Sequence, residues 1–342
     1  AGVPLVPLVL WGGQRLLTKN RKITLSERTN VPVVMVVGEP ISVAPTDDAI
    51  EATAKLKTTM EGLLETAQKS YPVEGAGQWW FPRHLGGTAP TPEEAAAADA
   101  ARDVDVLITM LPNGAILRSV ADEVIPAMNK GAALLDCSTV DVESARAVAE
   151  QCVAAGLLAL DAPVSGGIGG ASGGTLTFMV GGTEEGFNKA LPLFEIMGQK
   201  AVHCGASGNG QAAKICNNMI LGATMIVTCE AFALADKLGL DRQKMFDVVS
   251  TSSGYSWSMN AYCPAPGVGP ASPADNDYKP GFASELMLKD LRLAQEAAIT
   301  ANADTPIGAL AQALYAQFVE DEDGAGKDFS AMLPRFEKSE RP

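Results

Sequence analysis

The sequence predicts an α/β fold in which a partial, doubly wound parallel sheet is followed by an all-α C-terminal domain. Continuous apolar runs alternate with helical patterns between residues 105 and 205, as expected for parallel strands that helices cover on both faces. After Gly210 the pattern is helical to the end of the chain, apart from a Pro-rich stretch at 263–281. The composition before residue 100 differs from both parts. We therefore expect three regions, at residues 1–99, 100–206 and 207–337.

The first region predicts two strands and one helix. Strand-like apolar runs occupy residues 3–11 and 31–41, and a helical pattern extends from Thr46 to about Ser70. A loop rich in Gly and Pro follows at 77–90 and contains two adjacent tryptophans. An alanine-rich segment then leads into the second region.

The second and third regions differ in the spacing of their apolar residues. Short apolar runs that alternate with helical segments predict the sheet, with strands at 105–112, 131–140, 156–167 and 175–182, helices at 114–128, 141–155 and near 184–197, and a short closing strand, AVHC. Longer helical patterns predict the third region, with helices at about 209–238, 242–250, 283–302 and 306–319. The acidic segment 320–328 is expected to be a solvated loop.

Composition excludes several classes of partner. The chain has 342 residues, 47% of them hydrophobic, so it can bury a large core, and its net charge of −14 argues against nucleic acid or an anionic membrane. Six cysteines without a CxxC motif and only two histidines predict neither a disulfide framework nor a metal site. The most apolar run, Ile215 to Thr228, is too short to span a bilayer. We expect a soluble, cytoplasmic chain with reduced thiols.

The segment HCGASGNGQAAKICNN at 203–218 has two interpretations. Its Gly208-x-Gly210-x-x-Ala213 spacing is typical of a dinucleotide-binding turn. Such a turn needs a second strand that ends in an acidic residue, and here an apolar helix continues instead. Gly208 and Gly210 are therefore expected to allow a tight start of the helix or close backbone packing.

The same helix carries Lys214 and, one turn later on the same face, Asn218. A lysine among apolar neighbours loses part of its preference for the charged form, which suits a proton donor and acceptor near neutral pH. The alternative is an ordinary lysine whose stem covers apolar surface while its ammonium reaches water.

A second candidate site follows a predicted strand. DAPVSGG at 161–167 places Ser165, Gly166 and Gly167 where ligands bind in open α/β sheets. A hydroxyl beside glycine N–H groups can hold a carboxylate. The alternative is a turn that simply requires small residues.

Four motifs together resemble a known family. They are DAPVSGGIGGASGGTLTFMVGG, GNGQAAKICNN, GFASELMLKDL and ASPADNDYKPGF. In this order they are similar to the β-hydroxyacid dehydrogenases over about residues 101–335, and within that family they look most like the 3-hydroxyisobutyrate dehydrogenases. The resemblance implies an oxidoreductase with a Rossmann-like sheet, in which hydride passes between 3-hydroxyisobutyrate and a nicotinamide cofactor.

The resemblance also implies a role for individual positions. Lys214 would be the catalytic acid/base, Asn218 would orient the substrate hydroxyl, and Ser165, Gly166 and Gly167 would bind the substrate carboxylate. The positions implied near the cofactor are Leu111, Pro112, Thr139, Phe282, Lys289 and Asp290. The cofactor would be NAD, with NADP not excluded, and the helical domain would support a homo-oligomer.

The resemblance leaves part of the expected fold without a counterpart. Members of the family begin with a strand, a GxGxxG turn and a helix, and none of the 34 glycines here forms GxGxxG. We therefore expect the first βαβ units of the sheet, with the pyrophosphate cradle, to be missing. Residues 1–98 instead contain GVPLVPLVLWGGQRLL, VVGEPI, a helix ending in KSYP and WWFPRHLGGTAPTPEEA. On these segments they resemble the C-terminal part of a glycerolipid acyltransferase of the lysophosphatidic-acid type. Its HxxxxD motif is absent, because Ala89 and Gly208 stand where aspartate would follow His84 and His203.

Three other functions remain open at this stage. A catalytically silent protein would fold and oligomerise without binding NAD, and the missing cradle favours it. A reductase of tartronate semialdehyde is the alternative within the family, although the segment at 271–282 favours 3-hydroxyisobutyrate. Acyl transfer lacks its His–Asp pair. A natural fusion after a deletion and an error of sequence assembly would both produce two C-terminal pieces joined near residue 100.

Overall fold

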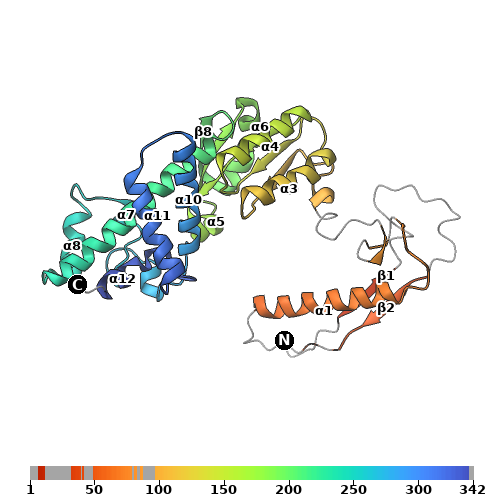
Figure 1. The fold of residues 1–342 in the computed structure, drawn as a ribbon, viewed down its shortest axis with the longest axis horizontal. Helices are drawn as coiled ribbons and strands as arrows, with labels where there is room; N and C mark the ends of the chain where they lie inside the picture. The colour runs from red at the N-terminus through yellow and green to blue at the C-terminus, as the bar shows by residue number, and fades with distance from the viewer. Residues whose placement is uncertain are drawn as a thin grey trace. The chain divides into compact units, whose positions relative to one another are not determined.

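The structure is a computed structural model, and it describes residues 7–11, 32–39, 41, 49–78, 81–82, 85–87 and 97–338. These residues belong to two compact units, 1–96 and 97–342 (Figure 1). His84 and the two adjacent tryptophans of the 77–90 loop lie outside the described residues.

Unit 1 contains two short strands and one long helix. Strands β1 (Leu8–Trp11) and β2 (Val34–Val37) pair antiparallel, with Leu8 opposite Val37. Helix α1 (Ala49–Lys69) packs against both strands. The predicted strands and helix of this region are confirmed, within narrower bounds than the apolar runs suggested.

Unit 2 begins with a six-stranded sheet. Its strands lie in the order β3-β4-β5-β7-β8. The short strand β6 follows β5 along the chain and pairs with β7 beyond the end of β5. The strands are β3 (Val106–Thr109), β4 (Ala133–Asp136), β5 (Leu158–Asp161), β6 (Val164–Ser165), β7 (Leu176–Gly182) and β8 (Gly198–Gly205). Strands β3, β4 and β5 are parallel, and the predicted α/β class is confirmed.

The sequence predicted a sheet of parallel strands alone, and the second half of the sheet differs from that prediction. The predicted strand at 156–167 is two strands, because it breaks at Ala162 and Pro163, and proline has no N–H to donate to a ladder. Strand β7 then runs antiparallel to β5 and β6. The connection from β6 to β7 contains only the seven-residue helix α5 (Gly167–Gly173). A crossover to a parallel strand needs a dozen or more residues, so the chain returns antiparallel.

Helices cover both faces of the sheet. On one face lie α3 (Gly114–Val124), continued by the 3₁₀ turn η4 (Ile125–Ala127), and α4 (Val142–Ala154), and on the other lies α6 (Glu184–Met197). Leu134 packs with the first group and Leu135 with the second, which is the alternation expected along a strand.

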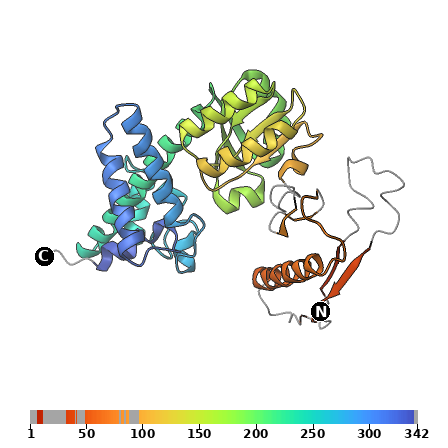
Figure 2. The ribbon, with the colours of Figure 1, turned by 45° about the vertical axis from the view of Figure 1, so that its right-hand side comes forward.

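A long central helix, α7 (Asn209–Lys237), organises the second half of unit 2 (Figure 2). It contacts most of the later elements, and their core includes Met225, Phe232, Leu291 and Tyr315. The later elements are α8 (Arg242–Val249), α9 (Trp257–Asn260), η5 (Pro273–Asn276), α10 (Ser284–Thr300), α11 (Pro306–Ala316), the π-helical turn η6 (Gln317–Asp321), η7 (Phe329–Ala331) and α12 (Met332–Lys338).

The length of helix α7 corrects the expectation that this apolar segment is too short to span a bilayer. The run at 215–228 is short, but the whole helix has 29 residues and, by length and composition, could cross a membrane. Half of its most apolar window is buried inside the protein. Core helices of soluble proteins have the same properties, so this helix is weak evidence for a membrane span.

Candidate active site

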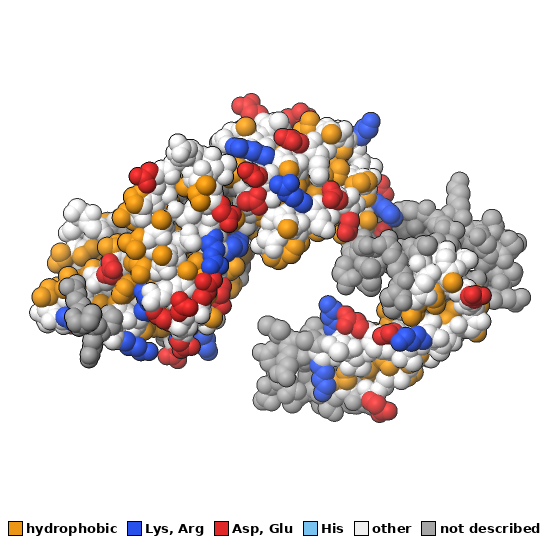
Figure 3. Space-filling view, in the orientation of Figure 1, with side chains coloured by type: hydrophobic (Ala, Val, Ile, Leu, Met, Phe, Trp, Pro, Cys, Tyr) orange, Lys and Arg blue, Asp and Glu red, His pale blue; other side chains and the backbone are white. Residues whose placement is uncertain are grey.

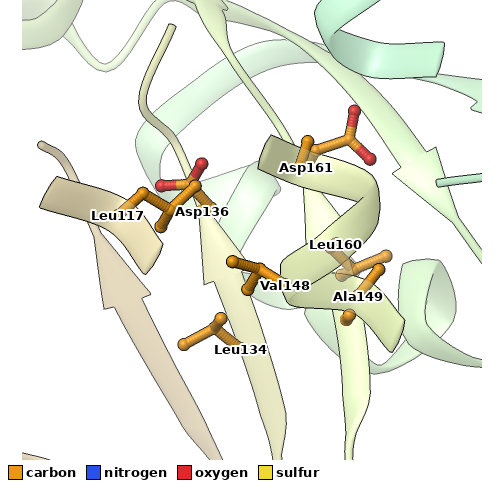
Figure 4. A pocket seen from close by; sticks show the side chains of 9 residues that line it. Leu117, Leu134, Asp136, Val148, Ala149, Leu160 and Asp161 are labelled. Atoms are coloured by element: carbon orange, nitrogen blue, oxygen red, sulfur yellow. The ribbon is translucent and has the colours of Figure 1, made fainter. Parts of the chain in front are cut away.

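The candidate site lies where β4 and β5 end and α7 begins. Asp161, the last residue of β5, accepts hydrogen bonds from the N–H groups of Gly208 (2.7 Å) and Gln211 (2.9 Å). A carboxylate at a helix N-terminus is stabilised by the helix dipole and by the free N–H groups. This contact fixes α7 against the sheet. Figure 4 shows Asp136 and Asp161 at the ends of neighbouring strands, beside a small gap lined mainly by apolar side chains beneath α4.

The glycines of the α7 turn are needed for its geometry. Gly208 has a φ of +87°, a backbone conformation that favours glycine. A Cβ on Gly210 would lie 2.3 Å from the carbonyl oxygens of both Asp161 and Met179. The interpretation of these glycines as a tight helix start with close packing is confirmed. The turn is filled by protein atoms, so it does not cradle a pyrophosphate.

Lys214 and Asn218 lie on one buried face of α7, as their spacing predicts. Their side chains are 7% and 1% exposed, respectively. Burial lowers the pKa of Lys214 from its ordinary value of 10.5; the charge of Asp290 opposes this shift, and that of Lys289 adds to it. Because the two opposite charges act against each other, desolvation is the main cause of the lowered pKa.

A chain of polar contacts connects this helix face to α10 and to the end of β4. Asn218 donates to Oδ2 of Asp290 at 2.5 Å, and Oδ1 of Asp290 lies 3.4 Å from Nζ of Lys289. Lys289 in turn donates to the backbone carbonyl of Thr139 at 2.8 Å. The structure therefore brings together four of the predicted residues, which stand as far as 150 positions apart in the sequence.

The predicted carboxylate site forms a separate loop. Gly166 and Gly167 have φ values of +138° and +60°, so the backbone itself requires glycine there. A Cβ on Gly167 would lie 3.6 Å from the carbonyl oxygen of Gly281, next to Phe282. Ser165 ends β6 and is half-buried. Both interpretations of this turn, a carboxylate site and a turn of small residues, fit these contacts.

The remaining predicted positions lie at the edges of the site. The N–H of Leu111 donates to Oγ of Ser138 at 2.7 Å, and Pro112 beside it is exposed. Phe282 packs edge-on against Phe329, with ring centres 5.6 Å apart, and so belongs to the wall of the helical core.

Sequence reasoning missed four buried polar residues of this region. They are Asp136, Ser138, Asp161 and Gln211. Burial raises the pKa of Asp136, against hydrogen bonds from Ser138 and Thr109 that lower it. Burial likewise raises the pKa of Asp161, against the N–H groups at the start of α7. The available signal was an aspartate as the last residue of an apolar strand, since such a carboxylate lies at the edge of the sheet where helices begin.

Among residues 97–338 and the described parts of unit 1, no group of three His, Cys, Asp or Glu side chains could hold a metal ion.

Comparison with known proteins decides the family. Two family models match, the NAD-binding domain of 6-phosphogluconate dehydrogenase over residues 86–205 and the NAD-binding domain of NADP-dependent 3-hydroxyisobutyrate dehydrogenase over 208–336. The chain is 47% identical over 238 residues to a probable 3-hydroxyisobutyrate dehydrogenase of Mycobacterium tuberculosis, covering 70% of this chain and 80% of that protein. The chain belongs to the 3-hydroxyisobutyrate dehydrogenase family.

Two further matches refine this assignment. An NAD-dependent L-serine dehydrogenase of Pseudomonas aeruginosa is 43% identical over 248 residues, which cover 72% of this chain and 83% of that protein. The solved structure of the Mycobacterium tuberculosis 3-hydroxyisobutyrate dehydrogenase with L-serine is 44% identical, with a TM-score of 0.67, and covers 74% of this chain and 85% of that one. The predicted family and the Rossmann-like sheet with its helical domain are confirmed.

Membership of this family implies a nicotinamide cofactor, and the described residues fit one end of it. The half-exposed ammonium of Lys289 bonds to the backbone of the β4 turn, pairs with Asp290, which also holds buried Asn218, and acts on the pKa of buried Lys214. This donor set suits a nicotinamide ribose and a substrate hydroxyl. The pyrophosphate end is different. The described residues contain no GxGxxG turn, and the α7 turn is filled.

Proposed function

We propose that this chain is an NAD(P)-dependent dehydrogenase that oxidises the primary hydroxyl of 3-hydroxyisobutyrate to methylmalonate semialdehyde. The observation that carries the proposal is the buried Lys214, whose pKa is lowered by desolvation and which shares a helix face with Asn218. Family membership supplies the reaction class.

The proposed chemistry needs a base at the hydroxyl and an acceptor for hydride. A bound nicotinamide supplies the hydride acceptor. Neutral Lys214 takes the hydroxyl proton as the carbon–hydrogen bond breaks, and in the reverse direction its ammonium returns that proton. A lowered pKa increases the neutral fraction of Lys214 near physiological pH, which favours oxidation. Asn218, held by Asp290, orients the hydroxyl toward the lysine.

The other sites follow from the same proposal. Ser165 and the N–H groups of Gly166 and Gly167 bind the substrate carboxylate, supported by the positive φ values that this loop maintains. The proposed cofactor contacts are Leu111, Pro112, Thr139, Phe282, Lys289 and Asp290.

The substrate has two close competitors. L-Serine is also a 3-hydroxy acid with a primary hydroxyl, and it differs from 3-hydroxyisobutyrate in carrying an ammonium where the latter carries a methyl. The L-serine dehydrogenase relative makes it the second candidate. Reduction of tartronate semialdehyde is the third. A panel of these acids, with kcat/KM measured for each, decides among them, and 3-hydroxyisobutyrate is expected to give the largest value.

A silent protein that folds without binding cofactor is the alternative from another class. It is favoured by the absence of a GxGxxG turn from the sequence, because loss of the backbone contacts to pyrophosphate removes a large share of the cofactor's binding free energy. Calorimetric titration of the folded chain with NAD⁺ and with NADP⁺ distinguishes the two proposals. Binding in the micromolar range supports the dehydrogenase, and no binding of either supports the silent protein.

We also propose that the chain is a homo-oligomer in the cytoplasm. Hydrophobic side chains gather on the helical half of unit 2 in the view of Figure 3. Ile220, Val227 and Leu234 stand seven residues apart along α7 and are 62%, 56% and 59% exposed. A stripe of this kind suits contact with a second copy.

The described cysteines are all free thiols, which suits a reducing compartment. The likeness of residues 1–98 to an acyltransferase stays a prediction.

A further inference from the structure

Gln211 connects the proposed acid/base helix to the turn that follows β4. It lies in the first turn of α7 and its side chain is fully buried. Oε1 accepts the N–H of Val140 at 3.1 Å, and Nε2 donates to the carbonyl of Ser138 at 2.8 Å. The two partners lie 71 and 73 positions away in the sequence, so the bonds join parts of the chain that strands β5 and β7 separate along it.

These two bonds require a side chain that both accepts and donates a hydrogen bond, as the amide of glutamine does. One partner is a donor and the other an acceptor, so only a group that both accepts and donates satisfies them, and only one orientation of the amide does so. The N–H of Gln211 is itself held by Asp161. The side chain is therefore fixed at both ends, by its own helix start and by the turn that it contacts.

The turn that Gln211 holds contains Thr139. From the other side, Lys289 donates to the Thr139 carbonyl. Successive backbone groups at Ser138, Thr139 and Val140 thus bond to side chains of α7 and α10. Leu111 is joined to the same turn through Oγ of Ser138.

Gln211 also shares its helix face with the proposed catalytic Lys214 and the proposed substrate-binding Asn218. Lys214 follows three positions later and Asn218 seven, so all three project to one side of α7, with Lys214 about 4.5 Å further along the axis. A displacement of the turn relative to α7 therefore changes the distance between Thr139 and Lys214.

We propose that Gln211 is a positioning residue that sets the cofactor-facing turn at 138–140 relative to Lys214. This inference rests on the proposed function, because the distance between the turn and Lys214 matters for turnover only if Lys214 is the acid/base. The two hydrogen bonds of the Gln211 side chain do not depend on that function. Gln211 touches neither of the reacting groups and acts through the backbone of the turn.

Gln211→Met tests the proposal, because it keeps the length of the side chain and removes both bonds. Hydrogen exchange of the chain without ligand should show the Val140 N–H exchanging about tenfold faster, while the N–H groups of β4 and of the middle of α7 keep their protection. In turnover, the KM for the cofactor should rise and kcat should fall, with the KM for the hydroxy acid unchanged. Unchanged exchange at Val140, or an equal increase throughout residues 97–338, would overturn the proposal.

Gln211→Glu gives a second, sharper test. A protonated carboxyl has the same donor and acceptor as the amide, whereas a carboxylate cannot donate to Ser138. Its ionisation takes place among Asp161, Asp136, Lys214 and Lys289. The cofactor KM should return toward its wild-type value as the pH is lowered, because the introduced carboxyl takes up a proton and can again donate to the Ser138 carbonyl. The absence of any recovery in a folded variant would contradict the proposed positioning role.

Tyr315→Phe is the matched control. It also removes one bond from a fully buried side chain to a backbone carbonyl, that of Phe329 at 2.9 Å, within the helical core. It should lower the melting temperature and leave exchange at Val140 unchanged. If the wild-type chain does not turn over, the proposed function fails, and the exchange measurements still decide whether Gln211 holds the turn.

Discussion

Asn218 donates a 2.5 Å hydrogen bond to Asp290, and this contact joins α7 to α10 at the level of the proposed catalytic lysine. Both side chains are almost completely buried and stand 72 positions apart in the sequence. The same carboxylate pairs with Lys289 and acts on the pKa of Lys214. Asp290 therefore holds Asn218, which is proposed to orient the substrate hydroxyl, and opposes the lowering of the Lys214 pKa by burial.

Asp290→Asn should move the pH dependence of oxidation to lower pH. The negative charge of Asp290 raises the pKa of Lys214, so its removal lets burial and Lys289 lower that pKa further. Since oxidation requires neutral Lys214, the rise of kcat/KM with pH should begin earlier. A pH profile of kcat/KM measures the shift. Asp304→Asn removes an exposed carboxylate of the same unit and should leave the profile in place, and an identical profile for both variants would contradict the assignment.

Lys214→Met should abolish most of the turnover without unfolding the protein. General acid–base catalysis contributes about a hundredfold or more, so kcat should fall by at least that factor. Methionine fills the same volume and favours a helix. The matched control is Lys244→Met, at an exposed position of α8, which should keep wild-type rates. Full activity in Lys214→Met would show that another group moves the proton.

The same substitution should raise stability near neutral pH, because it removes a buried ammonium. A gain of about 1 kcal/mol corresponds to roughly 2–4 °C in the melting temperature of a unit this size. The pKa of Lys214 is lower in the folded chain than its ordinary 10.5, so between these two values only the unfolded chain holds the proton. Stability of the wild type therefore rises with pH across that interval. The advantage of the variant should shrink there, and an advantage that is independent of pH would contradict the account.

Gly210→Ala should prevent α7 from docking on β5. The added methyl would lie 2.3 Å from two backbone oxygens that cannot move aside, and overpacking of this kind costs about 3 kcal/mol or more. Gly169→Ala is the control, because a Cβ there meets no atom within 4 Å. Urea titration of both variants measures the difference. Equal urea midpoints for the two variants would contradict this account, because they would show that the start of α7 accommodates a methyl group at position 210.

Ser165→Ala should weaken the binding of substrate and affect the chemical step less. Loss of one hydrogen bond to a carboxylate costs about 1.5–3 kcal/mol, which is a rise of roughly tenfold or more in the KM for the hydroxy acid. Ser172→Ala, at an exposed position on α5, should leave KM unchanged. An unchanged KM in Ser165→Ala would leave the loop as a turn of small residues only.

Local pattern was sufficient to predict most of the elements. The apolar runs and helical spacing located α7 within one residue at its end, and the separation of Lys214 and Asn218 placed both on one face. The break at Pro163 was missed, because a continuous apolar run hides a change of strand direction. That change depends on the length of the connection to β7, which periodicity alone does not report.

The polar framework of the site could not be predicted in the same way. Asp161, Gln211 and Asp290 act through partners 47 to 73 positions away in the sequence, and only the fold brings those partners together. The Gly208 turn could be interpreted from the sequence, because the residues that directly follow it form a long helix where a dinucleotide-binding turn would need a second strand. Contacts between distant strands and helices leave no such local pattern.

The central claim is that this chain oxidises a 3-hydroxy acid with Lys214 as the base. Formation of reduced nicotinamide, followed by its absorbance, tests it most directly, with 3-hydroxyisobutyrate and NAD⁺ or NADP⁺ added to the wild type and to Lys214→Met. The account predicts steady reduction of one cofactor by the wild type and at least about a hundredfold less by the variant. No reduction of either cofactor by a folded wild type, or equal rates for both proteins, would contradict it.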